Sequence, residues 1–305
     1  MITRKKSVYR NGDIIDVSEC PDGRYGARGM PREKKKRPTP EQMRQVNHWN
    51  KVRRCRAYLL EHFRSGDTFV TFTYQIDERP QDMGEAMKDF KKAVDRIRKE
   101  YRKRDYELFW VRNIEQGTRG AWHIHMVVND IPDTGNILKK AWKKGFVYQI
   151  AIKDSDKYFD EDFMKLAEYL TKDEYTREKK QDGTIGKPRI KESSYSHSRN
   201  MQIVPPKKEK LRRWKREVEP KKGYYIARIW EGINSATGYK CRRYTMIRLN
   251  RSVKEDESYD IHRDYAGRSR HKKRRVRRGC RVHHKKRRKG DKGDLRDGEG
   301  NNVVS

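Results

Sequence analysis

The tripeptide His123-Ile124-His125 is the sequence feature whose residue types and spacing most directly indicate chemistry. It lies in the apolar run 122–128, which predicts a β-strand. Side chains at positions i and i+2 of a strand share one face, about 7 Å apart, so both imidazoles point the same way. Neutral imidazole is a common metal ligand, which makes the pair a candidate metal site. Two exposed polar residues on a wet strand face are the alternative explanation.

A carboxylate is expected on the same face. Residues 106–115 predict a second strand, which a loop over 117–121 joins to the histidine strand as a hairpin. That register sets Glu115 opposite His123, with Cβ atoms about 5 Å apart. Two imidazoles and one carboxylate leave coordination positions free for water or a phosphate oxygen. We therefore expect Glu115, His123 and His125 to form a metal site.

Tyr169 and Lys172 form a second candidate pair, on a helix predicted over 162–180. The apolar stripe of this helix comprises Phe163, Leu166, Ala167 and Leu170. Tyr169 falls away from the stripe, on the same side as Lys165 and Lys172. A phenol titrates near pH 10, and an adjacent ammonium or bound cation lowers its pKa, which favours attack by the phenolate. A simple surface contact between tyrosine and lysine is the alternative, and Tyr175 on the opposite flank is a second candidate nucleophile.

The elements that must position these side chains alternate between strands and helices. Strands are predicted over 68–74, 106–115, 122–128 and 146–152, and helices over 41–64, 80–104, 136–144 and 162–180. The hairpin in the middle of this order indicates an α+β sandwich, an antiparallel sheet with helices on one face, rather than a doubly wound parallel fold. Both histidines then lie on the face that no helix covers.

Composition indicates the partner. The chain of 305 residues carries 77 Lys and Arg against 44 Asp and Glu, a formal net charge of +33. Such charge favours a polyanionic partner, nucleic acid before an anionic membrane. No stretch reaches the roughly 20 apolar residues that span a bilayer, and the basic start lacks the apolar segment of a secretory signal. The four cysteines lie far apart and form neither a disulfide framework nor a CxxC pair, so we expect a reducing, cytoplasmic setting.

Charge and composition divide the chain into four predicted segments. Residues 1–40 are rich in Gly, Pro, Lys and Arg and predict a flexible basic arm. Residues 41–205 form the folded domain with the candidate site, and residues 206–266 form an accessory segment with a hairpin over 223–249. Residues 267–305 hold almost no apolar side chains and predict a disordered polybasic tail that tethers the protein to a polyanion.

Together these features resemble the HUH endonucleases, and among them the rolling-circle replication initiators (Rep proteins) of phages and plasmids. Three motifs carry the resemblance in the family's order: FVTFTY over 69–74, HIH over 123–125 and YLTK over 169–172. Glu115 stands where such proteins often supply a third metal ligand. The segment 196–201 is similar to one that follows the nucleophile helix in phage-type members.

The resemblance covers about 41–205 and implies a ferredoxin/RRM-like HUH fold and a metal-dependent DNA nicking and joining endonuclease. The two histidines and Glu115 would hold Mg or Mn. Tyr169 would attack the scissile phosphate and form a 5′-phosphotyrosyl bond, which leaves a 3′-OH for rolling-circle replication, and Lys172 would orient Tyr169 or the metal-bound group. The implied partners are single-stranded DNA, at an origin hairpin or nick site, and a helicase or polymerase of a bacterial host.

Further DNA contacts are expected from Lys165, Arg199 and Asn200, although an ordinary polar loop would also explain the last two. A relaxase or a transposase on the same HUH site is an alternative function. A non-catalytic RRM-like nucleic-acid-binding protein is another, but its open face would normally carry stacking aromatic rings rather than histidines. The chain has no GxxxxGK[ST] loop, so we expect no fused ATP-driven helicase domain.

Overall fold

Two antiparallel sheets and four α-helices make up the part of the protein that the computed structural model describes, residues 1–21, 37–117, 120–154, 159–172, 195–234 and 238–249. All of these residues belong to one of the chain's two units, Met1–Val253. The predicted α+β class is confirmed. The tail predicted over 267–305 and residues 173–180 of the helix predicted over 162–180, Tyr175 included, lie outside the described residues. In the described part this helix is shorter than predicted, Met164–Leu170, so Lys172 follows the helix rather than lying on it.

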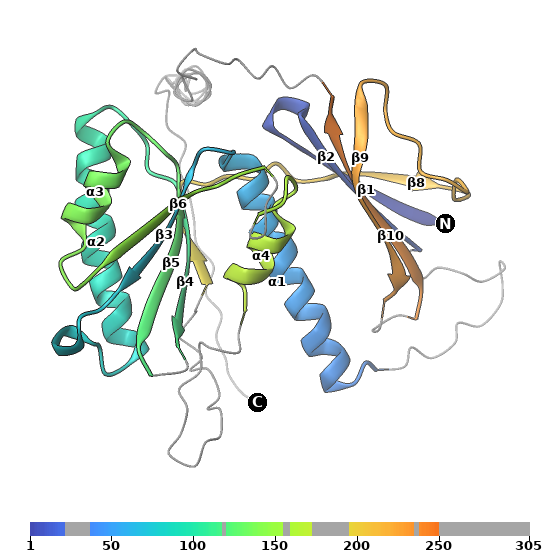
Figure 1. The fold of residues 1–305 in the computed structure, drawn as a ribbon. Coiled ribbons are helices and arrows are strands. Elements are labelled where there is room, and N and C mark those ends of the chain that lie inside the picture. The colour runs from blue at the N-terminus through green and yellow to red at the C-terminus, as the bar shows by residue number, and fades with distance from the viewer. Residues whose placement is uncertain (22–36, 118–119, 155–158, 173–194, 235–237, 250–305) are drawn as a thin grey trace, which may run out of the picture. The chain divides into compact units, whose positions relative to one another are not determined.

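The first sheet positions the candidate site and has the strand order β6-β3-β5-β4-β7. Its strands are β3 (Thr68–Thr73), β4 (Trp110–Gln116), β5 (Trp122–Val128), β6 (Val147–Ala151) and β7 (Tyr195–His197). After β3 comes a short 3-10 helix, η2 (Ile76–Glu78), and then α2 (Met83–Lys103), which leads to β4, while α3 (Thr134–Ala141) joins β5 to β6 (Figure 1). The predicted order of strand, helix, strand, strand, helix, strand is confirmed.

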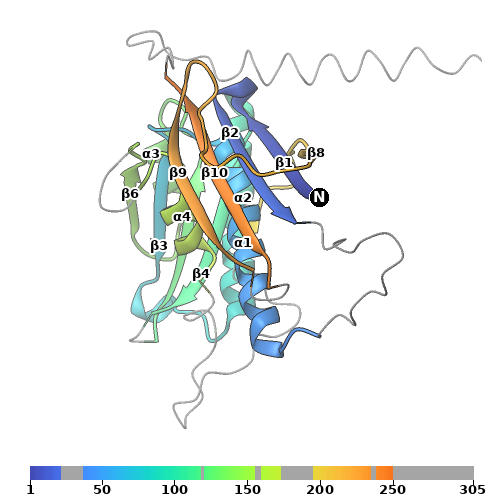
Figure 2. The ribbon, with the colours of Figure 1, turned by 90° about the vertical axis from the view of Figure 1, so that its right-hand side faces the viewer.

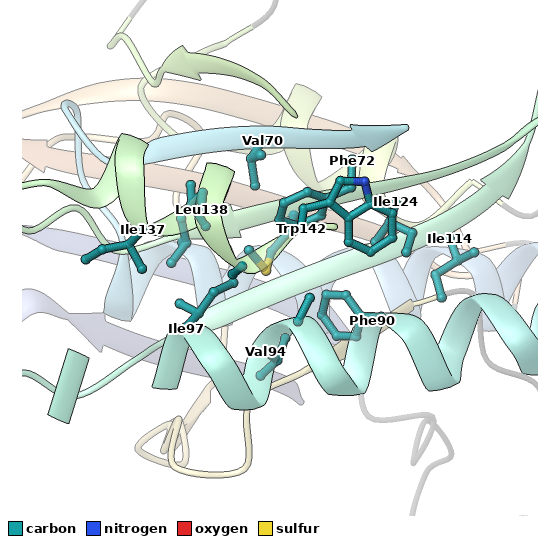
Figure 3. Packing of buried hydrophobic residues seen from close by; sticks show 14 of the residues in the cluster. Val70, Phe72, Phe90, Val94, Ile97, Ile114, Ile124, Ile137, Leu138 and Trp142 are labelled. Atoms are coloured by element: carbon teal, nitrogen blue, oxygen red, sulfur yellow. The ribbon is translucent and has the colours of Figure 1, made fainter. Parts of the chain in front are cut away.

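One face of this sheet packs against α2 and α3 through an apolar core, shown in Figure 3. Along α2, Phe90, Val94 and Ile97 recur at three- and four-residue steps and are buried. They belong to one cluster with Ile124 of β5. Because side chains alternate along a strand, burial of Ile124 on this side turns both histidines of β5 to the other side.

The other face of the sheet is covered by helices as well, which corrects the prediction of helices on one face only. Helix α1 (Pro40–His62) contacts β4, and the ring of its Tyr58 lies 3.9 Å from the ring of His197 in β7, measured between centroids. Helix α4 (Met164–Leu170) brings the candidate nucleophile onto this face. Figure 1 shows α2 and α3 on one side of β3, β4 and β5, and α1 and α4 on the other. Both α1 and α4 bury apolar side chains, which need an apolar surface to pack against.

The second sheet has the strand order β8-β1-β2-β10-β9 (Figure 2). Its strands are β1 (Ile2–Tyr9), β2 (Ile14–Pro21), β8 (Lys207–Leu211), β9 (Tyr224–Ile233) and β10 (Lys240–Arg248), with a 3-10 turn, η1 (Arg10–Gly12), between β1 and β2. The flexible arm predicted over 1–40 is therefore wrong for its first half, since apolar side chains of β2 such as Ile15 and Val17 are buried in this sheet. The hairpin predicted over 223–249 is confirmed by the pairing of β9 with β10.

Cys20 and Cys241 form a disulfide between β2 and β10, a single link that the sequence analysis did not predict. The two cysteines are 221 residues apart in the sequence. Antiparallel pairing of Glu19 with Arg242 brings them together. The spacing of the cysteines did not indicate this because the two strands come from distant parts of the chain.

Candidate active site

The β4–β5 hairpin has the predicted register, with Glu115 directly opposite His123. The amide of Gly117 donates a hydrogen bond to the carbonyl oxygen of Ala121 (2.8 Å) and closes the turn. A Cβ atom at position 117 would lie 3.2 Å from Nε2 of His123. The glycine therefore leaves room for the imidazole against the turn.

Side chains from three elements converge beside this hairpin. Nε2 of His125 on β5 lies 2.7 Å from Oε1 of Glu115 on β4. The hydroxyl of Tyr169 on α4 lies 3.0 Å from the same imidazole nitrogen and donates to Oε1 of Glu115 over 3.4 Å. The predicted nucleophile therefore reaches two of the three predicted metal ligands.

Thr71 on β3 holds the other side of the imidazole, with its Oγ1 2.9 Å from Nδ1 of His125. When the Thr71 hydroxyl donates to Nδ1, the proton of the neutral ring sits on Nε2 and is donated to Glu115. The tautomer is assigned from this hydrogen-bond pattern. In that arrangement the carboxylate of Glu115 accepts from both His125 and Tyr169.

Aromatic rings enclose the cluster. Phe69 on β3 stacks on His125, with ring centroids 5.9 Å apart, and lies edge-on to Tyr169 at 6.0 Å. Only 7% of the surface of His125 is exposed, whereas His123 is half-buried. The rings of His123 and Phe69, both half-buried, therefore border a largely buried His125.

Burial and the neighbouring carboxylate of Glu115 raise the pKa of Tyr169 well above its usual value of 10.0. This is opposite to the lowering predicted from the lysine three residues later. Lys172 does lie beside the tyrosine, but its Nζ stands over the face of the ring, 5.2 Å from the centroid. The carboxylate, in contrast, is hydrogen-bonded to the hydroxyl itself, so its charge acts more strongly on the proton.

The pKa values of Glu115 and His123 are both lowered. Burial alone would raise the pKa of Glu115, but the hydrogen bond and charge of His125, with smaller effects of His123 and Lys172, lower it. Burial and the neighbouring His125 lower the pKa of His123, against the attraction of Glu115. An ionised carboxylate beside a neutral imidazole is the state in which both groups can act as metal ligands.

The structure brings two of the three predicted metal ligands, Glu115 and His125, into contact. Among the described residues, no three His, Cys, Asp or Glu side chains are placed so that they could hold one metal ion. Glu115 and His125 are in contact, and the ring of His123 lies 6.4 Å from that of His125 between centroids. A carboxylate oxygen is a preferred donor for Mg and Mn, and imidazole suits first-row transition metals. The carboxylate and imidazole groups are therefore suitable donors for Mg or Mn. The ring of His123, however, is turned towards the hairpin loop.

All candidate catalytic and metal-binding residues lie in a part of the chain that resembles a known family. Residues 67–174, the family-matched segment, match the model of the replication-associated protein ORF2 family. This match bears out, for that segment, the predicted resemblance to replication-associated proteins, whose role in replication implies DNA as the partner of such proteins. No curated protein and no solved structure matches the chain. None of the described helices is both long and apolar enough to cross a membrane.

The predicted DNA contacts lie in and beyond the family-matched segment. Lys165 is exposed on α4, inside the segment. Arg199 is exposed just after β7, outside it. Asn200, also outside it, donates from its amide to the carbonyl oxygen of Leu108 (3.2 Å), so part of its role is to hold the chain before β4.

Two residues of the family-matched segment were missed from the sequence. Thr71 is the direct cross-strand neighbour of His125, which could have been found by extending the strand register to β3. Asn113 is the neighbour of His125 on the other side. It is completely buried, and neither its amide nitrogen nor its amide oxygen has a hydrogen-bond partner in the described part of the chain. No pattern in the sequence marks it.

Proposed function

We propose that the protein initiates DNA replication by nicking single-stranded DNA with Tyr169 as the nucleophile. The observation that carries this proposal is the contact of the Tyr169 hydroxyl with both His125 and Glu115, within a segment that matches a replication-associated family. A tyrosine, an imidazole and a carboxylate in mutual contact supply a nucleophile and groups that can accept its proton.

The reaction is a transfer of the phosphoryl group between two oxygens. Oη of Tyr169 forms a bond to the scissile phosphorus, and the bond between phosphorus and O3′ of the preceding nucleotide breaks. The phenolic proton passes to the carboxylate of Glu115, which accepts its hydrogen bond in the resting state. The departing O3′ takes up a proton from solvent water and leaves as a 3′-OH that can prime synthesis. Because one phosphate ester replaces another, the reverse attack can rejoin the strand.

A divalent cation, Mg²⁺ or Mn²⁺, would supply Lewis-acid polarisation of the scissile phosphate when bound. Glu115 and His125 would hold it, and His123, which lies on the same face of β5 but is turned towards the hairpin loop, would become a third donor only after its side chain rotates. With a cation on Nε2 of His125, the ring proton would lie on Nδ1 and be donated to Oγ1 of Thr71, which fixes the orientation of the ring as partners of metal-binding histidines commonly do.

Lys172 acts on Tyr169 through its ring. The ammonium over the ring face is in cation–π contact and restricts the rotation of the phenol. Its positive charge is also available to the phosphate that approaches the hydroxyl. Lys172 is therefore a positioning residue in this proposal.

The topology supports the proposal. The order β3-α2-β4-β5-α3-β6, with strands arranged as β6-β3-β5-β4, is that of a ferredoxin-like fold, which is the scaffold that the resemblance to HUH endonucleases implies. In this arrangement β5, the histidine strand, is a central strand between β3 and β4. Both its neighbours then contribute a side chain to the site, Thr71 and Glu115.

The proposal is tested by incubating the protein with circular single-stranded DNA and Mn²⁺ and looking for a protein–DNA adduct that survives denaturation. Tyr169→Phe should abolish the adduct, whereas Tyr239→Phe, a change of an exposed tyrosine just before β10, and Tyr175→Phe should leave it unchanged. An adduct formed at the normal rate by Tyr169→Phe would refute the assignment of the nucleophile.

A further inference from the structure

A pocket of about 550 Å³ lies between α1, α4 and the second sheet. Its walls include Trp49 and Arg53 of α1, Glu168 of α4, Trp230 of β9 and Arg243 of β10. None of Glu115, His123, His125 and Tyr169 lines it. It is therefore separate from the candidate active site, and most of its walls lie outside the family-matched segment.

Some of the charge in this pocket is already neutralised. Arg56 forms ion pairs with Asp16 (3.1 Å) and Asp162 (3.2 Å). Arg228 forms ion pairs with Asp160 (2.8 Å) and Asp162 (2.6 Å). These two arginines and their acids form a network that holds α1, the start of α4 and the second sheet together.

Arg53 and Arg243 have no such partner. Neither forms an ion pair within the described residues, although Asp16 and Glu168 also line the pocket. Nε of Arg53 donates to the backbone oxygen of Trp49 (2.8 Å), and Nε of Arg243 is buried without a hydrogen-bond partner in that part of the chain. Burial and the nearby charge of Arg243 lower the pKa of Arg53 to about 10, against a smaller attraction by Asp16. Two half-buried like charges are costly, and an anion between them would offset the cost.

Aromatic rings border the same cations. Trp49 is 36% exposed and Trp230 43% exposed, although indole rings are usually buried. The guanidinium of Arg243 lies 5.0 Å from the centroid of the Trp230 ring. Exposed indoles beside guanidinium groups are what proteins that bind single-stranded nucleic acid use, with the rings stacking on bases and the cations holding phosphates.

We propose that this pocket binds an unpaired nucleotide of the substrate strand, with its phosphate on Arg53 and Arg243 and its base stacked on the indoles of Trp49 and Trp230. This inference rests on the proposed function, because it takes single-stranded DNA as the substrate. The pocket would hold the DNA strand at a point away from the residues that carry out the reaction.

Helix α4 contributes residues to both the pocket and the candidate active site. Glu168 lines the pocket, and the next residue, Tyr169, contacts His125 in the active site. Neighbouring residues of a helix point in directions about 100° apart, so one helix contributes to both sites. A strand held in the pocket would lie along the helix that carries the nucleophile, and this would increase the local concentration of the scissile phosphate.

The test measures binding of a fluorescein-labelled oligothymidylate of about 15 nucleotides to the full chain without divalent ions, by fluorescence anisotropy. Loss of one stacking ring in Trp49→Ala or Trp230→Ala should weaken binding roughly 5- to 100-fold, and Trp49→Phe should restore most of it. Arg53→Ala should also weaken binding and reduce the salt slope by about 0.7. Arg54→Ala is the matched control, since Arg54 is the exposed neighbour on α1, and it should stay within about twofold of wild type.

Equal losses in Arg53→Ala and Arg54→Ala would overturn the proposal, because they would indicate only general attraction to the basic surface. Equal competition by a polyglutamate peptide would also overturn it, since a peptide offers anions without bases. Thermal unfolding of each variant shows whether it is folded, and Trp49→Phe keeps the test valid if Trp49→Ala is not. With Mn²⁺ and subsaturating oligonucleotide, the pocket variants should form the Tyr169 adduct more slowly than wild type, in proportion to their loss of affinity. Absence of any adduct from wild type would instead refute the proposed function, while the binding results would still decide on the pocket.

Discussion

The two sheets of this protein are assembled in different ways. In the first sheet, β3, β4, β5 and β6 follow one another along the chain, and the candidate chemistry depends on a single hairpin register that pairs Glu115 with His123. In the second sheet, β1 pairs with β8, so that Ile2 meets Leu211, and β2 pairs with β10. The first arrangement places reactive groups by local geometry. The second uses distant parts of the chain to build a cationic, aromatic pocket beside the same helix, α4.

If this division is correct, changes in the first sheet should alter the rate of the reaction, and changes in the second should alter stability and DNA affinity. The largest effect is expected for Glu115→Gln, which keeps the size of the side chain but removes the proton acceptor. The rate of adduct formation at saturating DNA should fall about 10²- to 10⁴-fold. Gln116→Ala on the same strand is the control and should have little effect. An unchanged rate in Glu115→Gln would break the assignment of the chemistry to the first sheet.

Arg56→Ala should cause the largest loss of stability. The Arg56 guanidinium is bonded to the backbone oxygen of Asp162 (2.7 Å), to Oγ1 of Thr245 (2.8 Å) and to the carboxylate of Asp16 (3.1 Å). Its removal takes the counter-charge from half-buried Asp16 and one of two from buried Asp162, and it leaves the buried oxygen acceptors of Asp162 and Thr245 without their donor, which together costs about 3–5 kcal/mol. Urea unfolding measures this loss, and exposed Arg54→Ala should change stability by less than about 0.5 kcal/mol. Equal stability of the two variants would show that α1 and the second sheet are not held together by Arg56.

The disulfide is expected to matter next. Replacing both Cys20 and Cys241 by serine removes a link that closes a long loop, and unfolding should become easier by about 2–4 kcal/mol. A reductant should lower the melting temperature of the wild type but not that of the double variant. The adduct rate at room temperature should stay the same, because the link lies in the second sheet. A large fall in that rate would show that the two sheets are not separable in function.

The smallest effect is expected for Thr71→Val, which removes the hydroxyl beside Nδ1 of His125 and keeps the shape of the side chain. Loss of such an orienting partner should lower activity by about tenfold. Thr73→Val is the matched control, because the hydroxyl of Thr73 bonds the backbone oxygen of Phe146 instead of an imidazole. Equal activity of the two variants would show that the Thr71 hydroxyl does not contribute to the reaction by orienting His125.

The candidate site was largely predictable from the sequence because its geometry is local. Alternation along β5 places His123 and His125 on one face, and a loop of fixed length sets Glu115 opposite. The apolar stripe of the last helix was enough to show that Tyr169 is not a core residue, and it lies off that stripe. The predicted effect of Lys172 on the pKa of Tyr169 failed, since spacing along a helix does not reveal a carboxylate that approaches from another strand.

The rest could not be predicted, because it depends on contacts between distant residues. Alternation in the first residues of the chain does not show that β2 pairs with β10 or that Cys20 meets Cys241. The apolar pattern of α1 does not show which surface this helix packs against. In the structure it packs on the face of the first sheet that carries the histidines, which was expected to be uncovered. The pocket combines Trp49 with Trp230 and could be recognised only from coordinates.

The most direct test of the central claim, that the hydroxyl held by Glu115 and His125 is the nucleophile, is to map the site of DNA attachment by mass spectrometry. Trypsin cuts after Lys165 and Lys172, so Tyr169 is released in the peptide Leu166–Lys172, and Tyr175 is released in a different one. The account predicts a nucleotide remnant on the peptide Leu166–Lys172, at its one tyrosine. A remnant on the peptide with Tyr175, or on any other peptide, would contradict it.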